Sequence, residues 1–133
     1  MLLGGGLDAP APGKEVESYD GSAWTQITIM NTQREMGGGN GMQSSAVAVS
    51  GRNPPGSYAN TVNVEQWNGS AWTETSNVAT GRSYCSSTGS GAGTVGSGSS
   101  FFIGGATTSS TPNTLATEEF ADPVYAVKTV TTS

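Results

Sequence analysis

The chain has 133 residues, of which 34% are hydrophobic and 11% charged, and both fractions are low for a globular domain. Ten acidic against five basic residues give a net charge of -5, which excludes strong attraction to nucleic acid. The chain has no histidine, which removes the usual general base, the histidine-paired nucleophiles and the commonest transition-metal ligand. We therefore expect no enzyme activity, no cofactor and no metal site.

The chain starts with a short apolar run, Met1-Leu2-Leu3, and three glycines follow at once. This run is far shorter than the about 7–15 apolar residues of a secretion signal, and no run approaches the about 18 residues of a membrane span. We expect a soluble chain without membrane insertion. LLGG (2–5) itself predicts a first strand that ends at a glycine pair.

One phrase occurs twice, as YDGSAWT in residues 19–25 and as WNGSAWT in residues 67–73. The match extends outward at a constant spacing of 48 and includes Val16/Val64, Glu17/Glu65, Trp24/Trp72 and Arg34/Arg82. Beyond Arg34 the segment AVAVSG (46–51) matches SFFIGG (100–105) at an offset of 54, so the second copy carries a longer loop. The chain therefore contains an internal repeat, with a third, degenerate copy that begins at TEEF (117–120).

The centre of each phrase is an Asx-Gly pair, Asp20-Gly21 or Asn68-Gly69, and this pair is the strongest short signal for a hairpin. The flanking segments should be antiparallel neighbours, joined by a loop of two or four residues. Either loop places Tyr19 beside Trp24 on one face. We expect these aromatic pairs to form the core, because a chain rich in glycine and serine has few other large apolar side chains.

The elements predicted in chain order are all strands. Three lie in the first part of the chain (2–5, 16–20 and 22–27), four in the second (35–39, 45–51, 62–67 and 71–76), and four in the last (83–88, 99–105, 116–120 and a degenerate strand around Tyr125). Four short strands in about 40–50 residues are typical of one blade of a β-propeller.

The strand that closes on Gly-Gly, the VESYD and VEQWN strands, and the Trp and Arg that follow each of them together resemble the kelch repeat. The resemblance implies an all-β fold of about three four-stranded antiparallel propeller blades, the first of them incomplete. It divides a single domain, 1–133, into blade parts 1–34, 35–82 and 83–133. The phrase (D/N)GSAWT and the Gly/Thr/Ser-rich loops resemble kelch-like proteins of tailed bacteriophages, which implies a virion or tail-fibre component on the particle surface.

Three blades are fewer than the about four to eight of a closed propeller. We therefore expect either self-association, for instance two copies that complete one ring, or a chain that is part of a longer propeller. The partners would be copies of the chain itself or other virion proteins.

Three other features have simple explanations. Gly91 to Gly96 matches a dinucleotide-binding fingerprint, but the strand-to-helix context is missing and the stretch falls in the longer loop. The recurrence of Glu17/Glu65 and Arg34/Arg82 favours a structural ion pair over a ligand groove. The lone Cys85 has no cysteine or histidine partner in the sequence and is expected to be a packed thiol.

Candidate ligand contacts lie in the loops, where binding residues are usually placed on a rigid scaffold. Loops 52–60, 89–99 and 106–116 are variable, and their hydroxyl and amide groups suit a host glycan or receptor. The candidate contacts are Arg52, Asn53, Tyr58, Asn60 and Asn113. The alternatives are solvated loops on a purely structural capsid or tail protein, and a secreted bacterial carbohydrate-binding module.

Overall fold

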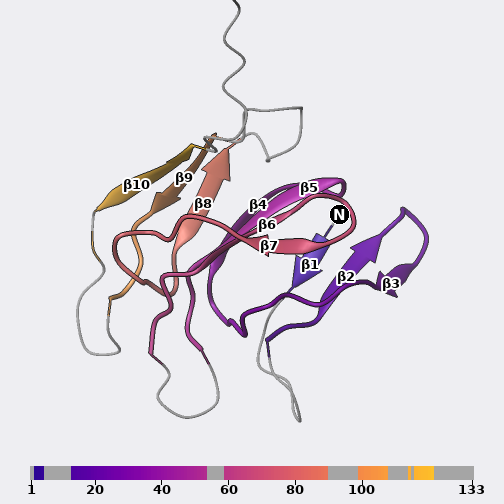
Figure 1. Cartoon of the computed structure of the whole chain (residues 1–133), viewed down its shortest axis with the longest axis horizontal. Helices are drawn as coiled ribbons and strands as arrows, with labels where there is room; N and C mark the ends of the chain where they lie inside the picture. Colours follow the sequence, from indigo (N-terminus) through magenta and orange to yellow (C-terminus); the bar gives the residue numbers. More distant parts are fainter. Residues whose placement is uncertain are drawn as a thin grey trace, which may run out of the picture.

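A computed structural model describes residues 2–4, 13–53, 59–89, 99–107, 114 and 116–121 (Figure 1). This part of the chain is all-β, with ten strands and no helix. The strands are β1 (Leu2–Gly4), β2 (Val16–Tyr19), β3 (Trp24–Gln26), β4 (Gly38–Met42), β5 (Ser45–Val49), β6 (Val64–Trp67), β7 (Trp72–Glu74), β8 (Ser86–Gly89), β9 (Ser99–Ile103) and β10 (Thr117–Ala121). The predicted all-β class is confirmed.

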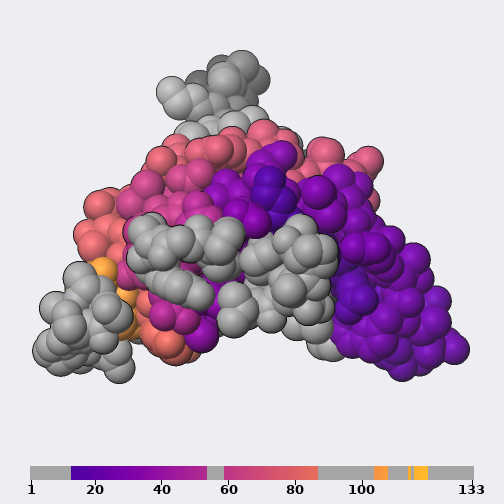
Figure 2. Space-filling model, turned by 90° about the horizontal axis from the view of Figure 1, so that it is seen from below, coloured from indigo at the N-terminus to yellow at the C-terminus, as the bar shows by residue number. Residues whose placement is uncertain are grey.

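The strands form three antiparallel sheets, each with its strands in chain order. The first sheet is β1-β2-β3, the second is β4-β5-β6-β7, and the third contains β8, β9 and β10. The sheets lie side by side, and both views place the first sheet at one end of the row with the second next to it (Figures 1 and 2). The strand that was predicted around Tyr125 lies outside the described residues.

β4 begins at Gly38, three residues later than the predicted strand 35–39. The reason is Met36, whose φ of 54° interrupts the extended backbone between Gly38 and the isolated bridge of Glu35 with Arg52. Tyr84, 48 positions later, has a φ of 55° and separates the isolated bridge at Ser83 from β8 in the same way. Non-glycine residues rarely adopt this conformation, so sequence patterning gave no sign of either break.

Both hairpins have the four-residue loop. Tyr19 pairs directly with Trp24, and their ring centroids are 5.1 Å apart. The Asp20 carboxylate accepts hydrogen bonds from the backbone N–H groups of Ser22 and Ala23, at 2.7 and 2.9 Å. These two bonds lower the pKa of Asp20, the one from Ala23 most. Gly21 supplies the one positive φ, 110°.

Asn68 performs the same function in the second hairpin, where its side-chain oxygen accepts from the N–H groups of Ser70 and Ala71 at 2.9 Å. Trp67 pairs with Trp72 at a centroid distance of 5.4 Å. The Asx residue therefore caps the loop. Asn68-Gly69-Ser70 also has the form of an N-glycosylation acceptor, but this turn already explains the sequence.

The two faces of β5 pack against different neighbours, and all five of its residues are buried. Val47 and Val49 form a cluster with Val64 of β6, against which Val78 and Cys85 pack. Burial raises the pKa of the Cys85 thiol, so it remains protonated at neutral pH. This agrees with the prediction of a packed thiol.

The opposite face of β5 contributes Ala48 to a second cluster, which joins the first and second sheets. Val16 belongs to the first sheet, and Met30 belongs to the segment after it. Trp72 of the second sheet packs against both. The core thus lies mainly on the two sides of the second sheet.

The expectation that the tryptophans form the core is correct for Trp67 and wrong for Trp24. Trp67 is 3% exposed, whereas Trp24 is 43% exposed. Trp72, the equivalent of Trp24 in a hairpin of the same register, is partly buried in the cluster with Val16 and Met30, so the exposure of Trp24 comes from what covers each sheet and not from the local structure.

Ser50 stands where the third sheet has a glycine, Gly104, and both residues have left-handed backbones, with φ of 54° and 64°. Such a backbone costs a residue other than glycine about 1–2 kcal/mol. The fully buried Ser50 hydroxyl accepts a hydrogen bond from the Arg82 N–H at 2.7 Å and lies 2.6 Å from the Thr61 carbonyl oxygen. The serine hydroxyl thus links the segments that contain Thr61 and Arg82, although its own backbone is strained.

We expect Ser50→Ala to lower the free energy of unfolding by about 1–3 kcal/mol, because it removes the hydroxyl that accepts from the buried Arg82 N–H while the strain remains. Ser50→Gly loses the same bonds but relieves the strain, so it should be about 1 kcal/mol more stable than Ser50→Ala. Urea unfolding measures both. An alanine variant as stable as the unmodified chain would contradict this role of the hydroxyl.

Candidate functional site

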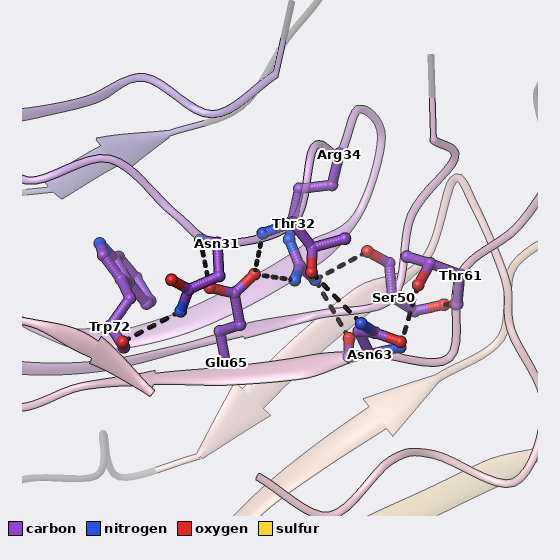
Figure 3. Close-up of polar contacts among 8 residues, drawn as sticks. All are labelled: Asn31, Thr32, Arg34, Ser50, Thr61, Asn63, Glu65 and Trp72. Carbon is purple, nitrogen blue, oxygen red and sulfur yellow. Dashed lines mark hydrogen bonds and ion pairs between the residues drawn. The ribbon is translucent and has the colours of Figure 1, made fainter. Parts of the chain in front are cut away.

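The best-defined polar site lies between the first and second sheets (Figure 3). The segment that follows β3 crosses to β6, where the backbone N–H groups of Asn31 and Thr32 donate to the Glu65 carboxylate at 2.7 and 2.9 Å. Arg34 Nη2 approaches Glu65 Oε1 at 2.7 Å. The Glu65 side chain is 0% exposed and that of Arg34 is 4% exposed. We call these four residues the first joint.

Further hydrogen bonds fix both ends of this segment. Arg34 Nη1 donates to the carbonyl oxygens of Ser50 and Asn63, at 3.0 and 3.1 Å. The Asn31 side-chain amide donates to the Trp72 carbonyl oxygen at 3.0 Å. The guanidinium therefore has several acceptors besides the carboxylate, as a buried charge requires.

The second and third sheets are held in the same way. Arg82 pairs with Glu118 of β10, and Ala79 N–H donates to the other oxygen of this carboxylate at 2.6 Å. Arg82 Nη1 donates to the Ala116 carbonyl oxygen at 3.1 Å. We call Ala79, Arg82 and Glu118 the second joint. The predicted structural ion pair is confirmed for Arg34 with Glu65 and lies between successive sheets, whereas Arg82 pairs with Glu118 and the predicted residue Glu17 is exposed.

The charge on Glu65 is stabilised by its partners. Burial by itself raises the pKa of this carboxyl, but the N–H groups of Asn31 and Thr32 and the Arg34 guanidinium outweigh burial, and the pKa is lowered. The carboxylate is therefore ionised at neutral pH, and the joint is a true ion pair.

A third ion pair lies at the base of loop 52–60. Arg52 Nη2 is 2.7 Å from Glu35 Oε1, and the Glu35 side chain is 2% exposed. The Arg52 guanidinium also lies over the Tyr84 ring, 5.4 Å from its centroid, and 3.0 Å from Met36 Sδ. The repeat gave no sign of this cluster, because the positions equivalent to Glu35 and Arg52 are Ser83 and Ala106.

The structure brings three of the five candidate ligand contacts together. The backbones of Arg52 and Asn60 form an isolated antiparallel β-bridge. The Asn53 N–H donates to the Ala59 carbonyl oxygen at 3.0 Å. The Asn60 amide donates to the carbonyl oxygens of Ala106 and Thr107, at 2.8 and 2.9 Å. Asn53 is exposed. Tyr58 and Asn113 lie outside the described residues, as do most of loops 89–99 and 106–116 and the Gly91 to Gly96 motif.

A cavity of about 500 Å³ adjoins the first joint. Its wall is β4, whose glycines present little side-chain volume, together with Met30, Met36 and Trp72. The polar groups on this wall include Arg34 and Glu35, and both are already in ion pairs. From Gly38 onward the glycine-rich stretch lies in strand β4 and is not a phosphate-binding loop.

A comparison with protein-family models finds no match, and neither does a comparison with curated proteins. Within the described ranges, no group of three or more potential ligands could hold a metal ion. These residues also contain no helix of the length and apolar character needed to cross a bilayer.

The first joint yields a stability prediction with an internal control. Glu65→Gln leaves the buried Arg34 guanidinium without a counter-charge and should lower the free energy of unfolding by about 3–5 kcal/mol at pH 7. Glu17→Gln, the same change at the equivalent position of the first sheet, should cost less than about 0.5 kcal/mol, because Glu17 is exposed. Equal losses in urea unfolding of the two variants would contradict the assignment.

The lowered pKa of Glu65 also sets a pH dependence. The stabilisation from a carboxyl whose folded pKa lies below its ordinary value of 4.5 is complete above that value. It is lost as the pH falls through the folded pKa. The unmodified chain should therefore lose stability below about pH 4.5 more steeply than Glu65→Gln does.

Proposed function

We propose that the chain is a non-enzymatic structural protein of a bacteriophage virion, built from kelch-like β-propeller blades. The observation that carries the proposal is the recurrence of one buried Arg–Glu joint between the first and second and between the second and third sheets. Propellers arise by repetition of four-stranded antiparallel sheets, and the second sheet has this form. A joint that recurs supports a regular stack of blades.

The viral attribution rests on the (D/N)GSAWT phrases and the Gly/Thr/Ser-rich loops, which resemble kelch-like proteins of tailed phages. In this proposal the chain lies on the particle surface, in contact with copies of itself or with other virion proteins. A rigid stack of sheets is a suitable platform for attachment to the host or for decoration of the particle.

Loop 52–60 is the favoured place for contact with a host glycan or receptor. Its base is held by the Arg52–Asn60 bridge and by the hydrogen bond from Asn53 to Ala59. Asn53 is exposed at this base and offers an amide to a hydroxyl-rich ligand. The arrangement supports a binding loop with a fixed base.

A purely structural role in the capsid or tail is the second candidate. It is favoured by Arg52 and Asn60, because both side chains contact other parts of the same chain. In this case the loops only fill space between neighbouring proteins. A secreted carbohydrate-binding module would bind glycans in isolation but would not be part of a particle.

A glycan array with the purified full chain separates these functions. We expect selective binding that Asn53→Ala reduces at least about tenfold without a change in melting temperature, since an exposed polar side chain adds little stability. Asn60→Ala is the control, because it should lower the free energy of unfolding by about 1–3 kcal/mol through its lost hydrogen bonds. No binding to any glycan would contradict the attachment role and favour the structural one.

Mass spectrometry of purified virions from the source phage tests the location. We expect the chain among the particle proteins, in a fixed ratio to its neighbours. Glycan binding by a chain that is missing from every particle would contradict the virion role and favour the secreted module.

A further inference from the structure

The first sheet carries the acceptor half of a third joint. Its Glu17 occupies the position of Glu65, and its Trp24 occupies the position of Trp72, each 48 residues earlier. The register is the same in both hairpins, since Tyr19 pairs with Trp24 as Trp67 pairs with Trp72. The backbone that presents the carboxylate and the indole is thus already formed.

The direction of these side chains follows from the two-residue period of a strand. Val16 packs against the second sheet, in the cluster with Ala48 and Trp72. Glu17 is one position further along β2 and points to the opposite side, away from the second sheet. The first sheet stands at one end of the row (Figures 1 and 2), so this side faces outward.

The burial of equivalent residues differs sharply. Glu65 is 0% exposed and receives two backbone N–H groups and a guanidinium, whereas Glu17 is exposed and its carboxylate has no hydrogen bond or ion pair with any of the described residues. Trp72 is partly buried against Val16 and Met30, whereas Trp24 is 43% exposed. We call Glu17 and Trp24 the open acceptor face.

The two occupied joints define the chemistry of what fits this face. Each carboxylate takes a guanidinium and at least one backbone N–H from a segment that follows a hairpin. In the first joint the same segment also places Met30 in the cluster with the tryptophan. The matching partner is therefore an arginine-bearing segment with an apolar residue a few positions before the arginine.

A second copy of this chain has no such segment to offer. The sequence contains three arginines, Arg34, Arg52 and Arg82, and each is in an ion pair with a glutamate of its own chain. Removal of any of them from its pair would leave a buried or largely buried carboxylate without its counter-charge. The arginine must therefore come from a segment outside residues 1–133.

We propose that the open acceptor face of Glu17 and Trp24 binds an arginine-bearing repeat segment that lies outside residues 1–133. The bound segment donates backbone N–H groups and a guanidinium to Glu17 and covers Trp24 with an apolar side chain. This inference rests on the contacts between sheets alone, and it holds whether or not the chain belongs to a virion.

A synthetic peptide of residues 26–35 (QITIMNTQRE), which carries the donor half of the first joint, tests the proposal. Nuclear magnetic resonance of the full chain at millimolar peptide detects weak binding through the indole N–H signal of Trp24. We expect a saturable shift of this signal, and a peptide with R34M should bind at least about tenfold more weakly, because the charged contact is lost.

Variants of the full chain locate the contact. Glu17→Gln should weaken peptide binding at least about tenfold. Glu119→Gln changes the net charge equally at an exposed position of β10 and should leave binding within about twofold. No shift at Trp24, or equal binding by the Glu17 variant, would overturn the proposal.

A second copy of the chain is the other possible partner of this face. Analytical ultracentrifugation of the chain without peptide tests it. We expect no self-association that depends on Glu17. A dimer that Glu17→Gln or Trp24→Ala dissociates would assign the face to a second copy and overturn the proposal.

Discussion

The buried ion pair of Arg34 and Glu65 is the constraint on which the arrangement of the sheets depends. Removal of two charges from water costs several kcal/mol per ion, and their attraction recovers this cost only when the geometry is good and the remaining donors and acceptors are satisfied. Here the carboxylate receives two backbone N–H groups, and the guanidinium donates to two carbonyl oxygens. A shift of the segment after β3 by one residue would break these bonds together. The joint therefore specifies how one sheet lies on the next, beyond any stability it adds.

The polar joints work beside small apolar clusters and not in place of them. With 34% hydrophobic residues, the chain can bury few large side chains, and the clusters on the two sides of β5 consist largely of valine and alanine. Such clusters are weakly directional, because hydrophobic burial depends mainly on area. On β6 the two kinds of contact alternate, since Val64 faces one cluster and Glu65 faces the joint on the other side. One short strand thus contributes to hydrophobic burial on one face and to the ion pair that orients the neighbouring sheet on the other.

The sequence predicted the features that matching residues of the two copies mark, and it missed those that no matching residues mark. The spacing of 48 was enough to place the hairpins, the aromatic pairs and the Arg–Glu pairing, because each copy supported the interpretation of the other. It could not reveal the Glu35–Arg52 pair or the left-handed backbones at Met36 and Ser50, which depend on contacts between distant segments. Trp24 was misjudged for a related reason: residue type and register are local, whereas burial is decided by the neighbouring sheet. The five ligand contacts, at Arg52, Asn53, Tyr58, Asn60 and Asn113, all stay predictions.

The repeats also differ in length, but the extra residues lie where they do not disturb the Arg–Glu contacts of the joints. Arg82 follows Arg34 by 48 positions, while the apolar strand of the second copy follows that of the first by 54, and both carboxylates still meet their arginines. The joint residues lie on strands or on the short segment after a hairpin, and the extra residues fall between β8 and β9. Closure of a longer loop costs little, since each doubling of length adds only about 0.6 kcal/mol. Loops can therefore change in length and composition while the buried carboxylates keep their partners, and this separation lets one scaffold present different surfaces.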